Sequence, residues 1–268
     1  MSLDIAEQHV RNGALDEALA ALQVAVRDDP SDARKRVFLF QLLCVTGDWK
    51  RALVQLNTAA ELDNDALLMA QTYRELLQCE AYRADVFAGH RAPLVFGEPP
   101  VWIATLLEAV AAASTGQGER ARTLIDDTFE SAPARCGEID GQAFEWLADA
   151  DMRLGPVVEA VIDGKYYWIP FDTVSSIALS KPEDLRDLVW LPAHFTWTNE
   201  GTAIGFLPAR YPGQSSVETS DRAMGRKTEW TDIGAAFYTG AGQKMLTSDQ
   251  ADYPLLATRK IVFDQAAT

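Results

Sequence analysis

The sequence predicts an α+β fold, in which degenerate helical repeats at the N-terminus precede a small antiparallel β-rich domain. Three observations predict it: a 34-residue repeat in the first half, a change from helical to β-branched patterning after Gly155-Pro156, and a hairpin signal at Asp163-Gly164. We assign residues 1–140 to the helical repeats, and residues 141–268 to a junction helix followed by the β-rich domain.

The first two repeats are related by residues of matching type that stand 34 positions apart. The pairs are Gly13 and Gly47, Leu15 and Trp49, Ala18 and Ala52, Leu22 and Leu56, and Ala25 and Ala59. This is the tetratricopeptide period, in which each repeat is a helix–turn–helix unit. We expect Gly13 and Gly47 to end the first helix of each unit, because glycine accepts the left-handed cap conformation. Ala18 and Ala52 are small where paired helices cross, and Pro30 stops the second helix of the first unit.

A weaker third copy begins with a helix expected over Val101–Ser114. Its matching positions are Gly116, Ala121, Ile125 and Pro133. A further helix at about 66–87 and a turn-rich stretch at 89–100 separate it from the second copy. About three repeats are needed for stability and repeat stacks need capped ends, so the C-terminal half is expected to act as a cap.

The second half is expected to start with a junction helix over Gly141–Leu154. Its apolar residues Phe144, Leu147, Ala148 and Met152 recur at helical spacing. Gly155-Pro156 then ends the helix.

Two strands, 157–162 and 165–171, are expected to form a hairpin around Asp163-Gly164. Further short strands are expected at 175–179, 188–191, 195–197, 202–207 and 259–263, and less clearly at 227–233 and 251–255. Asn199-Glu-Gly201 is expected to join two strands, and 212–224 to be a loop. Such a set suits a small antiparallel domain, of which a partly open barrel is one form.

The chain carries a net charge of −15, spread over both halves. A surface this acidic repels phosphate backbones and anionic lipids, so we expect neither nucleic acid nor membrane as a partner. The N-terminus has no signal-peptide pattern and no apolar run is long enough to span a bilayer, which predicts a cytoplasmic protein. Cys44, Cys79 and Cys136 lack paired spacing and are expected to be buried, reduced thiols.

No catalytic, cofactor-binding or metal-binding pattern is evident in the sequence. The three histidines lack metal-ligand spacing, and the glycines of 234–244 match no phosphate-binding loop, so this segment is interpreted as a turn. We therefore expect a protein that is not an enzyme and holds no cofactor or metal. The rival hypothesis of an enzyme would place a site in the β-rich half around Asp172, Asp187 and Arg210.

Two clusters are candidates for contact with a protein partner. On the expected junction helix, Trp146, Asp149 and Arg153 share one face, and Asp151 lies nearly opposite Asp149. These charges either line a groove for a partner or form an Asp149–Arg153 pair that supports the domain junction.

The second cluster is aromatic. Its candidate partner-binding members are Tyr167, Trp168 and Trp190. Strand alternation places Tyr166 and Trp168 on one face of the sheet and Tyr167 on the other. Most of these rings are expected in the core, and a minority exposed in one patch would anchor a peptide.

Several motifs in the second half resemble those of the ImpE/TagJ (SciE-type) family. They are Trp146 to Pro156, Gly164 to Phe171, Pro182 to Trp190, Leu207 to Pro212, Thr228 to Trp230, and Gly240 to Gln243. With the repeat helices, the resemblance covers nearly the whole chain.

The resemblance implies a non-enzymatic accessory factor of bacterial type VI secretion. It implies binding of the N-terminal helix of the small contractile-sheath subunit, TssB, and a link to ClpV, the ATPase that recycles contracted sheath. Such a helix would lay its apolar face into a groove, either the concave face of the repeats or the junction around 144–153. A generic repeat-built peptide chaperone or adaptor is the alternative.

Overall fold

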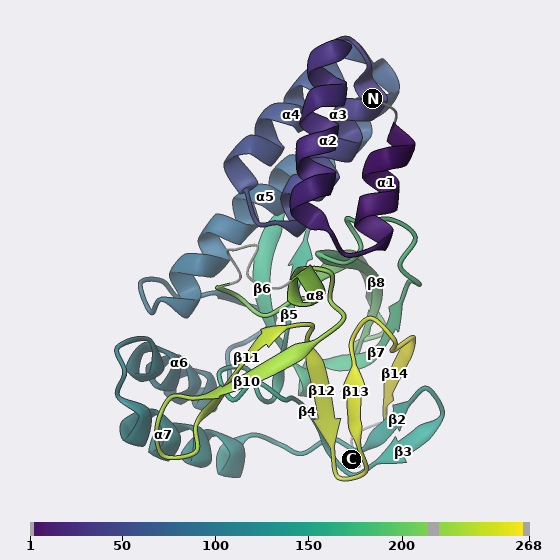
Figure 1. Cartoon of the computed structure of the whole chain (residues 1–268). Helices are drawn as coiled ribbons and strands as arrows, with labels where there is room; N and C mark the ends of the chain where they lie inside the picture. The colour runs from purple at the N-terminus through teal and green to yellow at the C-terminus, as the bar shows by residue number, and fades with distance from the viewer. Residues whose placement is uncertain (1–2, 214–219, 265–268) are drawn as a thin grey trace.

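The computed structural model describes residues 3–213 and 220–264. The two predicted repeats form helix pairs, stacked side by side at one end of the molecule (Figure 1). Their helices are α1 (Leu3–Arg11), α2 (Leu15–Asp28), α3 (Ala33–Val45) and α4 (Trp49–Leu62).

The predicted turn and crossing residues of the repeats are confirmed. Gly13 and Gly47 have φ angles of 74° and 76°, the left-handed conformation expected after the first helix of each pair. Ala18 and Ala52 are completely buried where the helices of each pair cross. Each repeat therefore closes locally, through its own turn and its own small residue.

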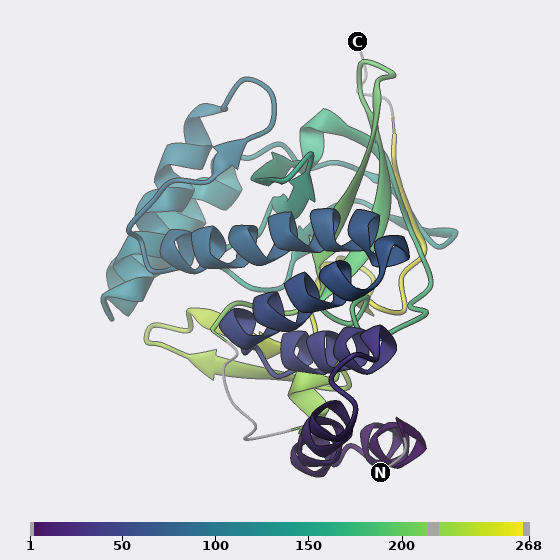
Figure 2. The same cartoon turned by 90° about the horizontal axis from the view of Figure 1, so that it is seen from above.

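After the second repeat, the next helix still packs on α4, and the third helix pair leaves the stack. A single turn η1 (Asn64–Ala66) leads into the long helix α5 (Leu67–Phe87), which runs over one face of the β sheet (Figure 2). The third helix pair, α6 (Val101–Ser114) and α7 (Gly118–Ser131), lies apart from α1–α4 at the other end of the molecule (Figure 1). The predicted interruption of the repeat stack is thus present.

The predicted junction helix over Gly141–Leu154 is wrong. The segment forms β3 (Gln142–Phe144), β4 (Leu147–Asp149) and turns, and β3 pairs with β2 (Gly137–Ile139) as a hairpin. The turn of this hairpin is Asp140-Gly141, with φ angles of 51° and 82°. It is the same dipeptide signal as Asp163-Gly164, and the apolar spacing that suggested a helix also fits two short strands.

Among the described residues, nine strands form one open sheet in the order β1-β6-β5-β9-β8-β7-β14-β2-β3, antiparallel except for β1 against β6. The strands not yet given are β1 (Leu94–Val95), β5 (Val157–Ile162), β6 (Lys165–Pro170), β7 (Val174–Leu179), β8 (Trp190–Trp197), β9 (Thr202–Pro208) and β14 (Lys260–Phe263). A 3-10 turn, η2 (Phe171–Thr173), joins β6 to β7. The hairpins at Asp163-Gly164 and Asn199-Glu-Gly201 are as predicted, whereas the expected strands 188–191 and 195–197 are one continuous strand, β8.

Two smaller sheets complete the second half. The strand β4 pairs with β12 (Met245–Ser248), which pairs with β13 (Asp252–Pro254). The hairpin of β10 (Thr228–Asp232) and β11 (Tyr238–Gly242) places a strand where 234–244 was interpreted as a turn. The expected loop 212–224 ends in a short helix, α8 (Ser220–Ala223), and its residues 214–219 lie outside the described part.

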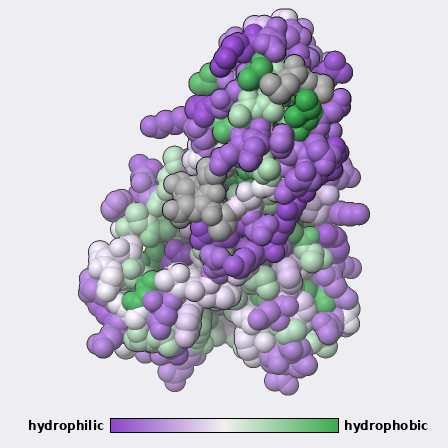
Figure 3. All heavy atoms as spheres, in the orientation of Figure 1, coloured by the Kyte–Doolittle hydropathy of each residue, from purple (hydrophilic) through white to green (hydrophobic). Residues whose placement is uncertain are grey.

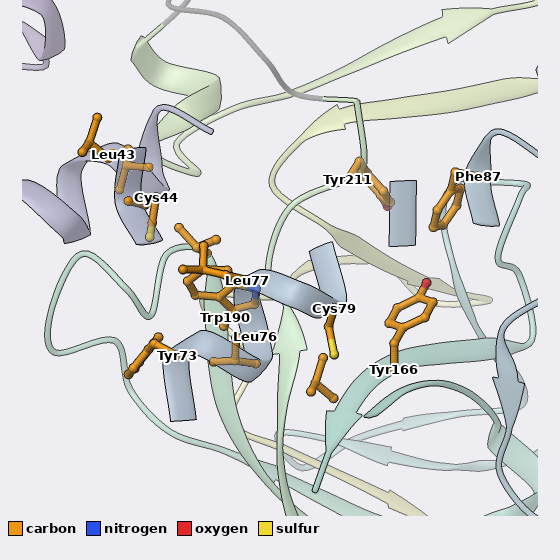
Figure 4. Close-up of a cluster of buried hydrophobic side chains, with 14 of the residues drawn as sticks. Leu43, Cys44, Tyr73, Leu76, Leu77, Cys79, Phe87, Tyr166, Trp190 and Tyr211 are labelled. Atoms are coloured by element: carbon orange, nitrogen blue, oxygen red, sulfur yellow. The ribbon is translucent and has the colours of Figure 1, made fainter. Parts of the chain in front are cut away.

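The nine-stranded sheet has an apolar core on each face. One core joins the sheet to α3 and α5 and contains Tyr73, Phe87, Tyr166 and Trp190 (Figure 4). Trp168 belongs to the same core. The other contains side chains from both ends of the sheet, such as Ile169 of β6 and Phe263 of β14, which shows that the sheet curls around it. In the described part of the chain, no helix has the length and apolar character needed to cross a lipid bilayer. Most of the surface seen in Figure 3 is hydrophilic.

Candidate partner-binding site

A cluster of buried charges lies between helix α5 and the β sheet. The carboxylate of Glu159, on β5, accepts hydrogen bonds from Arg83 Nε at 2.6 Å and Arg83 Nη2 at 2.9 Å. Lys244 Nζ lies 2.5 Å from Glu159 Oε2 and 3.1 Å from Asp149 Oδ2. All four residues are at most 5% exposed. We call Arg83, Asp149, Glu159 and Lys244 the buried ionic cluster.

Aromatic side chains close the buried ionic cluster. The Tyr166 hydroxyl donates to Glu159, and Trp168 Nε1 donates to the Tyr166 oxygen at 2.7 Å. The Tyr211 hydroxyl donates to Asp149 Oδ1 at 2.8 Å. Each carboxylate therefore has several donors, which is the condition for keeping charges in a dry interior.

The two carboxylates of the cluster titrate differently. Burial alone would raise the pKa of Glu159, but the charges of Arg83 and Lys244 outweigh burial and lower it to about 2. Asp149 shares only Lys244, so burial prevails and raises its pKa above the ordinary value. Arg83 and Lys244 together therefore lower the pKa of Glu159, whereas the pKa of Asp149 remains raised.

A second buried ion pair joins β11 and helix α5 to the turn after β4. Asp151 is completely buried and accepts hydrogen bonds from Arg153 Nη2 at 2.6 Å and from the backbone N–H of Gly240 at 2.7 Å. The Arg153 guanidinium lies 5.0 Å from the centroid of the Phe87 ring, at the end of α5. This turn therefore holds the hairpin β10–β11 and helix α5 to the sheet.

The prediction that Trp146, Asp149 and Arg153 share one helix face is wrong, because this segment is not a helix. Arg153 pairs with Asp151 and not with Asp149. Asp149 and Asp151 are buried, which favours a role in joining the two halves over direct contact with a partner. Trp146 is 39% exposed and lines a separate surface hollow.

The aromatic residues predicted to contact a partner also lie in different places in the fold. Trp168 and Trp190 are completely buried, and Trp190 Nε1 donates to Glu80 Oε1 at 2.9 Å. Tyr167 is half-buried on the opposite face of the sheet, as alternation predicted, and its ring lies 6.0 Å from that of Phe96. The fold does not bring these rings together in one exposed patch.

The residues of the rival enzyme hypothesis each contact different parts of the chain. Asp187 accepts from the backbone N–H groups of Glu183 and Asp184, and Arg210 donates to the carbonyls of Cys44, Val45 and Ala223. Asp172 lies in the turn η2 beside Arg135. Among the described residues, no His, Cys, Asp and Glu side chains cluster as a metal site would require. Cys44 and Cys79 are buried as expected, but Cys136 is exposed.

A groove of about 690 Å³ lies between the first helices of the two repeats and the segment 182–188 that precedes β8. Its apolar lining comprises Leu3, Val10, Ala33, Val37, Phe38, Pro182, Leu185 and Leu188. Its polar lining comprises Glu7, Arg11, Arg34, Gln41, Asp63, Glu183 and Asp184. We call this the repeat groove, and both halves of the chain build it.

The wall contributed by 182–188 is held in place by its own polar residues. Asp187 Oδ2 accepts from the N–H of Glu183 at 2.8 Å, and Asp184 Oδ1 from the N–H of Arg186 at 2.7 Å. The Arg186 guanidinium lies 4.8 Å from the centroid of the Tyr73 ring on α5. These contacts fix Leu185 and Leu188 against the main core and toward the groove.

The rim of the repeat groove is acidic. Its two arginines each have an acidic neighbour, Arg11 with Glu7 at 3.8 Å and Arg34 with Asp32 at 3.9 Å. Asp63 and Glu183 add negative charge on either side. The groove therefore suits an apolar surface bordered by basic residues.

Arg83, Glu159 and Lys244 were not predicted as site residues from the sequence. Glu159 stands inside the apolar run 157–162, and a charge in such a run is the signal that could have identified a buried ion. Arg83 and Lys244 carry no comparable local signal, because neither stands inside a continuous apolar run.

Comparisons with known proteins agree with this architecture. Residues 141–262 match the sequence model described as ImpE protein, and residues 9–72 match a tetratricopeptide-repeat model. The type VI secretion system accessory component TagJ of Pseudomonas aeruginosa is 47% identical over 97% of this chain and 91% of its own length. The X-ray crystal structure of protein VPA1032 from Vibrio parahaemolyticus has a TM-score of 0.89 at 25% identity, over 97% of this chain and 98% of that one. The predicted repeats and the family resemblance are confirmed.

Proposed function

This chain belongs to the ImpE/TagJ family, and on that premise we propose that it is a non-catalytic accessory component of type VI secretion. We propose further that it binds the N-terminal helix of the small sheath subunit, TssB, and so links the sheath to recycling by ClpV. The relative from Pseudomonas aeruginosa, named a type VI secretion accessory component, supports the first part. The sheath subunit and ClpV follow from the family resemblance.

The repeat groove is the observation that carries this proposal. Its apolar lining comes from α1 and α3, the first helix of each repeat, and from the segment 182–188. An amphipathic helix buries its apolar face in such a groove and keeps its polar face in water. The acidic rim adds attraction for basic residues on the sides of that helix.

The two parts of the chain have different tasks in this proposal. Residues 1–140 supply the helices that contact the partner, and residues 141–268 supply the groove wall 182–188. Of the residues predicted to contact a partner, Trp146 is exposed but lies outside the repeat groove, Arg153 is partly buried, and Asp149, Asp151, Trp168 and Trp190 are buried.

Calorimetric titration of the whole protein with a synthetic TssB N-terminal helix tests the proposal. We expect a saturable isotherm with one peptide per chain. Val37→Asp, in the groove, should weaken binding at least about tenfold, because it puts a charge against the apolar face of the helix. The matched control is Val54→Asp, on α4 outside the groove, where the side chain is 57% exposed.

The generic adaptor is the second candidate, since tetratricopeptide-like repeats bind many peptides. A peptide of the same composition in scrambled order separates the two. Equal affinity for both peptides would support the generic adaptor. No saturable binding of the sheath helix would overturn the sheath-binding proposal.

A further inference from the structure

A second surface hollow lies between helix α7 and strand β4, away from the repeat groove. It has a volume of about 340 Å³ and is lined mostly by apolar residues, among them Phe129, Pro133, Trp146 and Met152. Phe129 and Trp146 are 41% and 39% exposed, although they come from different elements. Two large rings exposed in one hollow are unusual for a surface without a partner and are typical of interface anchors. We call this the junction hollow.

A third exposed ring borders the junction hollow. The backbone N–H of Met152 donates to the carbonyl of Tyr238 at 3.3 Å, and the N–H of Tyr238 donates to Met152 Sδ at 3.1 Å. Tyr238 is 45% exposed at the start of β11. The apolar surface thus continues from α7 to the hairpin β10–β11.

The floor of the junction hollow is the edge of a sheet. Strand β4 pairs on one side with β12, and the N–H of Ala150 donates to the carbonyl of Met245 in that ladder. Because alternate residues of an antiparallel strand bond to opposite sides, Asp149 and Leu147 direct their backbone groups away from β12. The N–H of Asp149 already donates to Gly155 at 2.7 Å. The backbone of Leu147, which lines the hollow, is therefore oriented to pair with an added strand.

The rim of the junction hollow is negatively charged. Glu145 precedes Trp146, and its N–H donates to Asp249 Oδ1 at 2.8 Å, so two exposed carboxylate residues lie next to the backbone at Trp146. Glu130 follows Phe129 on α7 and is also exposed. Within residues 3–213 and 220–264, neither Glu130 nor Glu145 forms an ion pair. A basic segment would complement this rim.

We propose that the junction hollow binds an extended segment of a partner protein, in which apolar residues alternate with lysine or arginine. The segment adds a short strand to the edge of β4, and its apolar side chains pack on Phe129 and Trp146. Its basic side chains lie near Glu130, Glu145 and Asp249. A strand fits better than a helix, because a helix satisfies its own backbone groups and would leave those of Leu147 unused. This site is distinct from the repeat groove, so one chain can hold two segments at once.

Fluorescence anisotropy with the whole protein and a labelled peptide, Lys-Val-Arg-Ile-Lys-Val-Arg, tests the proposal. We expect saturable binding that weakens as salt is raised, and that is lost when glutamate replaces every basic residue. Two N-methylated peptides test the strand geometry, one methylated at the apolar residues and one at the basic residues. The N–H groups of these two sets point to opposite edges of a strand, so one peptide should lose binding and the other should keep it.

Substitutions test whether the peptide binds in the junction hollow. Trp146→Ser and Phe129→Ser should each weaken binding about tenfold or more, with melting temperatures that show a folded protein. Leu68→Ser, at a side chain 77% exposed on α5, is the matched control and should leave binding unchanged. Val37→Asp should also leave it unchanged, which keeps this test separate from that of the repeat groove.

Three results would overturn the proposal. They are the absence of saturable binding by the basic peptide, affinity retained in both Trp146→Ser and Phe129→Ser, and equal affinity of the two N-methylated peptides.

Discussion

The buried ionic cluster and the repeat groove use the family motifs in opposite ways. The charged motif residue Asp149 belongs to the cluster and Arg210 lies beside it, and both are buried and contact other parts of the same chain. In the groove, the motif segment 182–188 exposes Leu185 and Leu188 beside the repeat helices. The charged motif residues thus join the two halves of the chain, whereas the half-buried apolar ones line the groove in which we propose that the partner binds. Changes in the first region should act on stability, and changes in the second on affinity.

The largest effect is expected from Asp149→Lys. The new ammonium group would face Lys244 in the dry interior, in place of the carboxylate that now lies 3.1 Å from it. Breaking a buried pair costs about 3–5 kcal/mol, and reversing one charge should cost at least that. Thermal unfolding should show a fall in melting temperature of about 10 °C or more. Weaker partner binding without any loss of stability would show instead that Asp149 contacts the partner.

The next largest effect is the pH dependence of Glu159. Its folded-state pKa of about 2 is below the ordinary 4.5, so its stabilising contribution is fully present above 4.5 and is lost as the pH falls toward 2. The shift corresponds to about 3 kcal/mol. Urea unfolding of the wild type and Glu159→Gln should therefore give free energies of unfolding that converge over this range. If the difference in unfolding free energy between the wild type and Glu159→Gln stayed constant from pH 6 to pH 2, the lowered pKa of Glu159 would be contradicted.

In the groove, Val37→Asp should cost about 1.4 kcal/mol or more of binding free energy, which is a tenfold loss of affinity. Because Val37 is only half-buried, the melting temperature of the Val37→Asp protein should stay close to that of the control Val54→Asp. If Val37→Asp lowered the unfolding free energy as much as the binding free energy, the groove would not differ from the buried ionic cluster in acting on affinity alone.

An effect of similar size, on stability, is expected from Gly155→Ala, which lies against Phe129 of the junction hollow. Gly155 has a φ of 52°, and a Cβ there would lie 2.1 Å from Cε1 of Phe129. Left-handed strain and displacement of the ring should together cost about 1–3 kcal/mol. The matched control is Gly141→Ala, where φ is 82° and nothing lies within 4 Å of the new Cβ. Melting temperatures that fall equally in both variants would exclude the contact with Phe129 as a cause.

Local signals in the sequence predicted much of the fold. The repeat helices and their glycine turns follow from spacing within a few turns of chain, and the hairpin at Asp163-Gly164 from one dipeptide. The junction helix was wrong because apolar spacing over 141–154 fits a helix and two short strands equally, and the matching signal at Asp140-Gly141 was overlooked. For β8, Pro192 suggested a break between two strands, yet Ala193 and Leu191 continue the same ladder with β9.

The candidate sites were less predictable than the fold. The sequence suggested that Asp149, Asp151, Arg153 and the aromatic residues form a notable set, but not whether they face a partner or the interior. Trp146 stands three residues from Asp149, yet one is exposed and the other is buried.

The sequence by itself determined the helical repeats, most strands of the β half, the acidic charge and the family, because these depend on residue types and short spacings. Only the tertiary structure decided which charges are buried and where a groove opens. Arg83 and Glu159 are separated by 76 positions in the chain, and Arg210 and Cys44 by 166. Contacts at such separations arise from packing of whole elements, and local patterns carry no information on which elements meet.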